Sequence, residues 1–210
     1  MTVPDSPAER PPARVPAGAA VLRASVTSSV TAAVLEELAE VGYARTSMES
    51  VARRAGSGKS ALYRRWPSKR EMVLAAVAEL SVPAGPTPDT GSLRSDLLAL
   101  VQQVVQWLSD ARVSRILPDL TAEAARTPEL ADAVAASIGR PRREHGAVVL
   151  RRAVERGELD PGIDEELALD LLAALVHWRL VVRRAEVDEH YVQQVVDVLE
   201  RALRPAGPTA

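Results

Sequence analysis

Apolar residues recur every three or four positions along almost the whole chain, and this spacing constrains the fold more than any other feature. Val26, Val30, Val34, Leu38 and Val41 show it first. Such a period places apolar side chains on one face of an α-helix, whereas a half-buried strand needs alternation, and no alternating run stands out. The sequence therefore predicts an all-α protein.

Turn-forming residues divide this periodic sequence into helices. Gly42 ends the first helix as a C-cap. Capping boxes at Thr46–Glu49 and Ser68–Glu71, with Thr46 and Ser68 as the N-caps, open the second and the fourth helix. A short third helix runs from about residue 59 to 66. Further helices are expected near 92–109, 112–125, 128–138, 141–156, 164–184 and 188–203, with a break at Gly139 and Pro141.

Proline and glycine mark the boundaries of larger units. Residues 1–18 are rich in proline and poor in apolar residues, which is typical of a disordered arm. The clearest linker is "SVPAGPTPDTG", residues 81–91. We expect an N-terminal unit of three helices (19–67), a larger helical bundle (68–204) and a disordered tail (205–210).

Composition excludes several classes of protein. The chain has no cysteine, so it forms no disulfide and no thiolate metal site. No stretch approaches the length of an uncharged membrane helix, and Asp5 and Glu9 argue against a signal peptide, so we expect a cytoplasmic protein with no membrane partner. Neither H-E-x-x-H nor G-x-S-x-G occurs. We therefore expect no catalytic residue, no metal site, no cofactor and no enzymatic activity.

Charge is distributed unevenly. Residues 1–80 hold 11 basic and 8 acidic residues, whereas residues 81–210 hold 15 and 20. The excess is sharpest between Tyr43 and Glu71, with eight basic residues against two acidic ones. A basic N-terminal unit on an acidic body is typical of nucleic-acid binding, although a solvated surface also explains a charge cluster.

The stretch "GSGKS", residues 56–60, resembles the end of a phosphate-binding P-loop. A P-loop needs another glycine five residues before Gly58, a preceding strand and a long following helix. Arg53 occupies that position, the preceding residues form a capped helix, and Pro67 cuts the helix that follows. A nucleotide site is therefore disfavoured. Two short helices joined by a glycine-containing turn instead predict a helix-turn-helix, whose second helix enters the major groove of DNA.

Both lysines of the chain lie at expected helix starts, Lys59 at the third helix and Lys69 at the fourth. A cation there opposes the helix dipole, and a bound phosphate reverses the sign of that effect. We interpret the two lysines as DNA phosphate contacts, with unselective surface lysines as the alternative.

The segment "LEELAEVGYARTSMESVARRAGSGKSALYRRWPSKREMVLAAV", Leu35 to Val77, resembles the DNA-binding domain of the TetR family of bacterial regulators. The resemblance is strong over residues 20–80; beyond them it rests on helical content, length and two apolar final helices. It implies a homodimer with an N-terminal DNA reader and a body that binds a small inducer. Gly58 stands where the family commonly has a serine N-cap and gives no side-chain hydrogen bond, so either this turn is more mobile or Ser57 takes the role of the cap.

By position, the resemblance implies that double-stranded DNA is contacted by Thr46, Ser47, Lys59, Ser60, Ala61, Tyr63, Arg64, Arg65 and Lys69. We expect Ser60, Ala61 and Arg64 to read bases, because arginine can bond guanine through two hydrogen bonds and a methyl group can meet that of thymine. Arg65 can equally pair with Glu49 or Glu71. Whether Arg10, Arg14 and Arg23 reach an adjacent groove is left open.

Residues of the body have weaker assignments. Ligand-lining candidates are Trp107, Met72, Arg112, Arg115 and His145, although a core role for Trp107 and a solvated one for His145 are also consistent. The apolar stripes of the last two helices predict a dimer contact through Leu171, Leu175, Trp178, Val182, Val192, Val195, Val196 and Leu199. The predicted function is a repressor released from a palindromic operator by a small-molecule inducer. The alternative is a ligand-independent DNA-binding protein whose body only dimerises.

Overall fold

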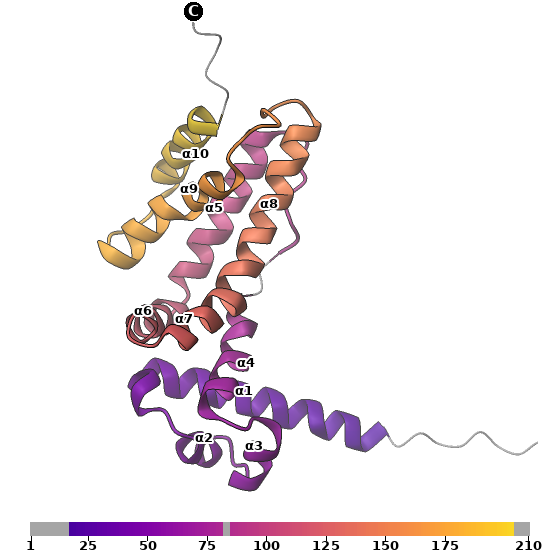
Figure 1. Cartoon of the computed structure of the whole chain (residues 1–210), viewed down its shortest axis with the longest axis vertical. Helices are drawn as coiled ribbons and strands as arrows, with labels where there is room; N and C mark the ends of the chain where they lie inside the picture. Colours follow the sequence, from indigo (N-terminus) through magenta and orange to yellow (C-terminus); the bar gives the residue numbers. More distant parts are fainter. Residues whose placement is uncertain (1–16, 82–84, 204–210) are drawn as a thin grey trace, which may run out of the picture.

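The computed structural model describes residues 17–81 and 85–203, and within them every regular element is helical (Figure 1). The N-terminal elements are α1 (Ala17–Arg45), α2 (Met48–Arg54), α3 (Lys59–Arg65) and α4 (Lys69–Ser81). They are followed by α5 (Leu93–Ser109), α6 (Val113–Ala124), α7 (Pro128–Val134), the π-helical η1 (Ala135–Gly139), α8 (Arg140–Glu155), α9 (Glu165–His177), the π-helical η2 (Trp178–Val182) and α10 (Glu189–Leu203). The prediction of an all-α protein is confirmed.

Parts of the expected arm and tail fall outside this description. Arg10 and Arg14 of the arm, and the expected tail at 205–210, lie outside the described residues, as does the side chain of Arg23. The helix α1 begins at Ala17, slightly before the expected end of the arm. None of the described helices combines the length and the apolar content that a membrane span requires.

The helices α1 to α4 share one hydrophobic core at the lower end of the molecule in Figure 1. Val34 of α1, Val51 of α2 and Leu62 of α3 are fully buried there. Leu62 is the only buried residue of α3, so this one side chain anchors the short helix while its other faces stay accessible. Met72 and Val73 bring α4 into the same core.

The start of α2 differs from the expected cap. Ser47 is the N-cap, and Ser47 and Ser50 form a reciprocal capping box. Thr46 is buried, and its hydroxyl donates to the carbonyl of Gly42 at 2.8 Å. The prediction of Thr46 as the cap was therefore wrong, because its side chain turns back to satisfy the end of the preceding helix. At α4 the expected cap is present, since the Ser68 hydroxyl accepts from the Glu71 amide at 3.2 Å.

Gly42 interrupts α1 at the point where the body meets the N-terminal core. Its φ of +79° lies in the left-handed region that glycine adopts without a steric penalty. The next amide, that of Tyr43, donates to the Asp119 carboxylate of α6 at 2.6 Å. A Cβ at Gly42 would lie 2.8 Å from the same carboxylate. The missing side chain thus lets α6 approach the bend in α1.

The helices α5, α8, α9 and α10 pack around a second core, which lies above the first in Figure 1. The predicted break at Gly139 and Pro141 was wrong, because α7, η1 and α8 follow one another without a gap. Pro141 falls in the first turn of α8, directly after the π-helical turn η1. The expected helix 164–184 is present as two consecutive segments, the α-helix α9, which ends at His177, and the π-helical η2, which ends at Val182.

Candidate nucleic-acid interface and ligand cavity

The turn between α2 and α3 has helix-turn-helix geometry. Gly56, with a φ of +61°, reverses the chain after α2, and Gly58 is the extended N-cap of α3 without a side-chain hydrogen bond. Ser57 does not replace the missing cap; its amide donates to the Ala52 carbonyl at 2.9 Å. The first turn of α3 therefore presents amides that no capping side chain occupies.

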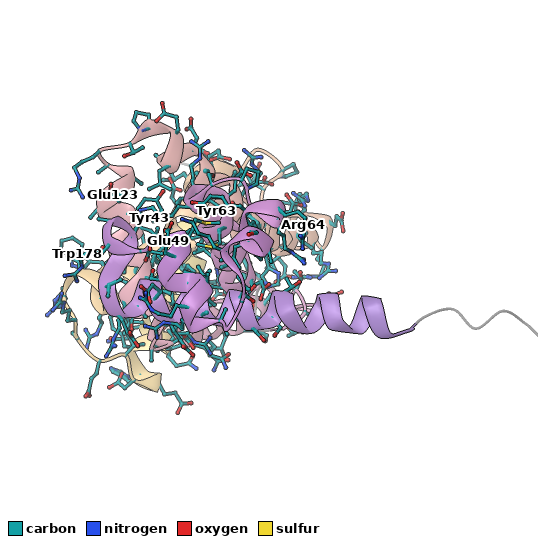
Figure 2. The ribbon with its side chains drawn as sticks, turned by 90° about the horizontal axis from the view of Figure 1, so that it is seen from below. Tyr43, Glu49, Tyr63, Arg64, Glu123 and Trp178 are labelled. Carbon is teal, nitrogen blue, oxygen red and sulfur yellow. The ribbon has the colours of Figure 1, made fainter. Side chains whose placement is uncertain are left out.

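The accessible face of α3 carries the predicted reading residues. Lys59, Ser60, Tyr63 and Arg64 are exposed, Ala61 is partly exposed, and Tyr63 is 43% exposed. Figure 2 views the molecule from the end formed by α2 and α3, where Tyr63 and Arg64 are labelled. A seven-residue helix is about 10 Å long, which suits a major groove about 12 Å wide.

Both lysines have partners inside the protein. Lys59 forms an ion pair with Glu49 of α2. The Lys69 ammonium lies 4.3 Å from the centre of the Tyr43 ring and donates to the Tyr43 carbonyl at 2.9 Å, at the C-terminal end of α1. Cations are favoured at helix C-termini, so this contact accounts for Lys69 without a phosphate. The position of the lysines at helix starts is therefore no independent argument for DNA.

Arginines, rather than lysines, supply the unpaired charge on this face. Arg54 is bound by three glutamates of α1, among them Glu37 at 2.9 Å. Arg65 packs over the Trp66 ring at 5.2 Å instead of pairing with Glu49 or Glu71. Among the side chains that the structure describes, Arg53, Arg64 and Arg70 form no ion pair. Because Thr46 is buried, its side chain is not accessible to a phosphate, and we leave it out of the interface.

The body holds a cavity of about 500 Å³ between α5, α8 and α9. Its wall is mainly apolar, with leucines from α5 and α9, whereas α8 contributes glycine, histidine and arginine. It is lined by Leu100, Gln103, Val104, Trp107, Leu108, Gly139, Arg142, Arg143, His145, Gly146, Leu169, Asp170, Leu172, Ala173, Ala174 and His177. This volume and composition suit a small organic ligand.

Two of the five predicted ligand-lining residues, Trp107 and His145, lie in this wall. Met72 was a wrong choice, because it is buried in the N-terminal core. Arg112 is exposed at the start of α6, and Arg115 lines a separate hollow beside η2, so the structure does not bring them to the cavity.

His145 ties the segment before α5 to the cavity wall. Its Nε2 lies 2.8 Å from Oε1 of Gln103, whose amide nitrogen donates to the Pro86 carbonyl. Since the Gln103 Oε1 can only accept, Nε2 of His145 carries the hydrogen, and Nδ1 accepts from the Thr87 hydroxyl at 2.9 Å. Burial, and then the charge of Arg142, lower the pKa of His145, so the ring is neutral near neutral pH.

Arg142 is the residue that sequence reasoning missed. Its guanidinium lies 3.5 Å from the centre of the Trp107 ring, and its Nε is buried without a hydrogen-bond partner. Burial lowers its pKa to about 10, still well above neutral pH. The available signal was spacing along the helices. Arg142 lies three residues before His145, and Gln103 four residues before Trp107, so each pair shares one helix face.

The predicted dimer residues fall into two groups. On α9 and η2, Trp178 and Val182 are 58% and 51% exposed, and Leu171 and Leu175 are partly buried. The four residues of α10 were wrong choices, because Val192, Val195, Val196 and Leu199 are buried in the core of their own chain. Leu167 of α9 and Val198 of α10 are also exposed. Such a cluster of exposed large apolar residues is typical of an interaction surface.

Among the described residues, no group of three or more histidines and acids is placed to hold a metal ion.

Known proteins resemble the chain over both halves. A family model described as "Bacterial regulatory proteins, tetR family" matches residues 30–76, and one described as "Tetracyclin repressor-like, C-terminal domain" matches residues 87–199. The HTH-type transcriptional regulator Rv1556 of Mycobacterium tuberculosis is 33% identical over 86% of this chain and 89% of its own. The DNA-binding transcriptional repressor TetR of Mycobacteroides abscessus is 32% identical over 86% and 95%. The crystal structure of the TetR family regulator SCO0332 superposes with a TM-score of 0.65, at 33% identity over 86% of this chain and 100% of that one.

Proposed function

Because this chain belongs to the TetR family of transcriptional regulators, we propose that it is a repressor that binds a palindromic operator as a homodimer and leaves it when a small molecule fills the body. The observation that carries the proposal is the combination, in one chain, of an accessible α3 and a cavity of about 500 Å³. The proposed site of action is the cytoplasm, where bacterial DNA lies, and no step requires catalysis.

On this proposal, α3 lies in the major groove and Arg64 reads a base. Its side chain is exposed and has no carboxylate partner among the described residues. Ser60 and Ala61 face the bases beside it, whereas Ser47, Tyr63, Lys59, Arg65 and Lys69 border the phosphates. Lys59 and Lys69 would then share their charge between a phosphate and the protein groups that they already contact.

We expect Arg64→Ala to weaken binding to the operator by about 5- to 150-fold, equivalent to roughly 1–3 kcal/mol for one base contact. Fluorescence anisotropy with DNA flanking the protein's own gene measures this change. Arg140→Ala is the matched control, because Arg140 is exposed at the start of α8 in the body. A loss that is equal for operator and unrelated DNA would identify Arg64 as a phosphate contact instead.

A hydrogen bond connects the cavity to the DNA-binding unit. The Trp107 indole, which lines the cavity, donates from Nε1 to the Leu80 carbonyl at 2.6 Å. Leu80 lies in the last turn of α4, whose earlier turns belong to the N-terminal core. A ligand that moves Trp107 would therefore shift α4, and this shift would change the distance between the two α3 helices of the proposed homodimer. By linkage, a 100-fold loss of DNA affinity needs about 2.7 kcal/mol of differential ligand binding.

Trp107→Phe tests this connection, because phenylalanine keeps an aromatic wall but cannot donate to Leu80. We expect the affinity of the variant for ligand to stay within about threefold of the wild type, because the smaller ring costs under about 1 kcal/mol of binding free energy. We also expect that ligand no longer releases the variant from DNA efficiently. The readout is operator anisotropy at increasing ligand concentration. Full release by the variant would exclude this route.

The alternative, a body that only dimerises, predicts a filled core. The open cavity favours a ligand-binding body. A screen of organic compounds by thermal shift, followed by operator binding at several salt concentrations, tests the proposal as a whole. Support requires a compound that both raises the melting temperature and lowers DNA affinity, together with a steep loss of affinity as salt increases. Stabilising compounds that leave DNA affinity unchanged would contradict it.

A further inference from the structure

The cavity contains one cation that the protein leaves without a counter-ion. Arginine carries five N–H donors on a planar guanidinium. Among the described residues, Arg142 makes no hydrogen bond or ion pair, and its Nε is shielded from solvent. Its one close partner is the Trp107 ring, which stacks on one face of the guanidinium and satisfies none of the donors.

The neighbouring charges do not compensate Arg142. The other arginine of the wall, Arg143, pairs with Glu166 and, at 2.5 Å, with Asp170, so these two acids are already engaged. His145 is neutral and bonded on both ring nitrogens. The polar part of the wall therefore carries net positive charge centred on Arg142, while the rest of the wall is apolar.

An unpaired, partly buried cation is costly unless a bound group compensates it. A planar oxyanion such as a carboxylate offers two oxygens at the spacing of the guanidinium nitrogens, and the pair then forms two charge-assisted hydrogen bonds. The Trp107 ring holds the guanidinium in one orientation, which reduces the entropy lost on binding.

Resting on the proposed ligand-responsive function, we propose that the effector is an apolar organic acid whose carboxylate pairs with Arg142. Its hydrocarbon part lies against the aliphatic wall formed by Leu100, Val104, Leu108, Leu169 and Leu172. The Gly146 backbone brings α8 close to α9, since a Cβ there would lie 3.0 Å from Leu169 and Leu172. The cavity thus has an apolar end and one cationic contact, and it selects against neutral and cationic compounds of the same shape.

Matched probes test this assignment by titration calorimetry on the full chain. The probes are decanoate and 2-naphthoate, each compared with its amide, which keeps the shape and removes the charge. For the wild-type protein we expect each carboxylate to bind at least about 30-fold more tightly than its amide. Arg142→Met, which keeps an apolar stem, should remove this preference, and Arg142→Lys should retain part of it. Arg140→Met, an exposed arginine on the same helix, should leave it unchanged.

Folding of the key variant is checked separately. Arg142→Met should melt at or above the wild-type temperature without ligand, because it removes an uncompensated cation. Equal binding of acid and amide, or a carboxylate preference that survives in Arg142→Met, would overturn the inference. If the amides bind and release DNA as well as the acids do, the proposed regulatory function stands and only the choice of an acid falls. If neither series binds, the assignment of an acid to this cavity falls, and the compound screen described above still decides the regulatory function.

Discussion

Trp178→Glu is expected to dissociate the proposed homodimer and to lower its affinity for the full operator by about 10²- to 10⁴-fold. Trp178 is 58% exposed and lies on one face with Leu167, Leu171 and Val182, at the spacing of a helix stripe. A buried tryptophan at the centre of an interface often carries much of its binding energy, and a carboxylate there would be desolvated without a partner. The loss in DNA affinity follows because the second DNA-binding unit is no longer held in the same molecule as the first.

Sedimentation velocity gives the oligomeric state, and anisotropy on an operator and on a single half-site gives the affinities. Gln102→Glu introduces the same charge at an exposed position of α5, outside the stripe, and should change neither measurement. The circular dichroism spectrum of Trp178→Glu should stay helical, because the side chain does not belong to the core. A variant that remains dimeric would place the interface elsewhere. A monomer that binds the full operator as tightly as the wild type would contradict the dimeric reader.

Asp96→Ala is expected to lower the free energy of unfolding by about 3 kcal/mol, and the melting temperature by about 6–12 °C for a chain of this size. Asp96 is fully buried at the start of α5. Its Oδ1 accepts from the amide and from the hydroxyl of Thr90, both at 2.7 Å, and its Oδ2 accepts from Arg156 at 3.0 Å. Alanine would leave these donors without their acceptor and release the segment before α5 from α8.

Urea unfolding monitored by circular dichroism measures this loss. Asp89→Ala is the matched control, because its carboxylate is 60% exposed and lies 4.0 Å from the same Arg156; the expected change is under about 0.5 kcal/mol. Burial alone would raise the pKa of Asp96, but the Thr90 hydrogen bonds and Arg156 outweigh it and hold the pKa below its ordinary 3.8. The contribution of the carboxylate is therefore present above that value and is lost as the pH falls through the folded pKa. Equal stability of the two variants would show that the network contributes little.

Local patterns were sufficient to predict the N-terminal unit. Glycine marked the interruption of α1 at Gly42 and the turn after α2 at Gly56, and both glycines have a positive φ. The choice between Thr46 and Ser47 as N-cap was beyond such patterns. Both are hydroxyl residues with a suitable residue three positions later, and the orientation of one side chain toward Gly42 decides between them.

The body was less predictable because its site depends on contacts between distant segments. Periodicity identified the apolar face of α10 but could not show whether the same subunit or a second subunit covers it. Val195 and Leu199 pack in the core of their own subunit. Arg142 is only 35 residues from Trp107, yet no sequence pattern indicates that their side chains stack or that no acid reaches the guanidinium. The position of a cavity follows from how helices fail to fill the space between them, which periodicity does not encode.

Selection from a random pool of duplex DNA tests the central claim, that α3 reads base pairs in the major groove, most directly. The wild-type protein should enrich a two-fold symmetric site with half-sites about one helical turn apart, and Arg64→Ala should lose the preference at one base pair in each half-site while keeping the rest. Two results would contradict the claim. The wild type could enrich no common sequence, or the wild type, Arg64→Ala and a triple variant with Ser60 and Ala61 also replaced could all enrich the same site.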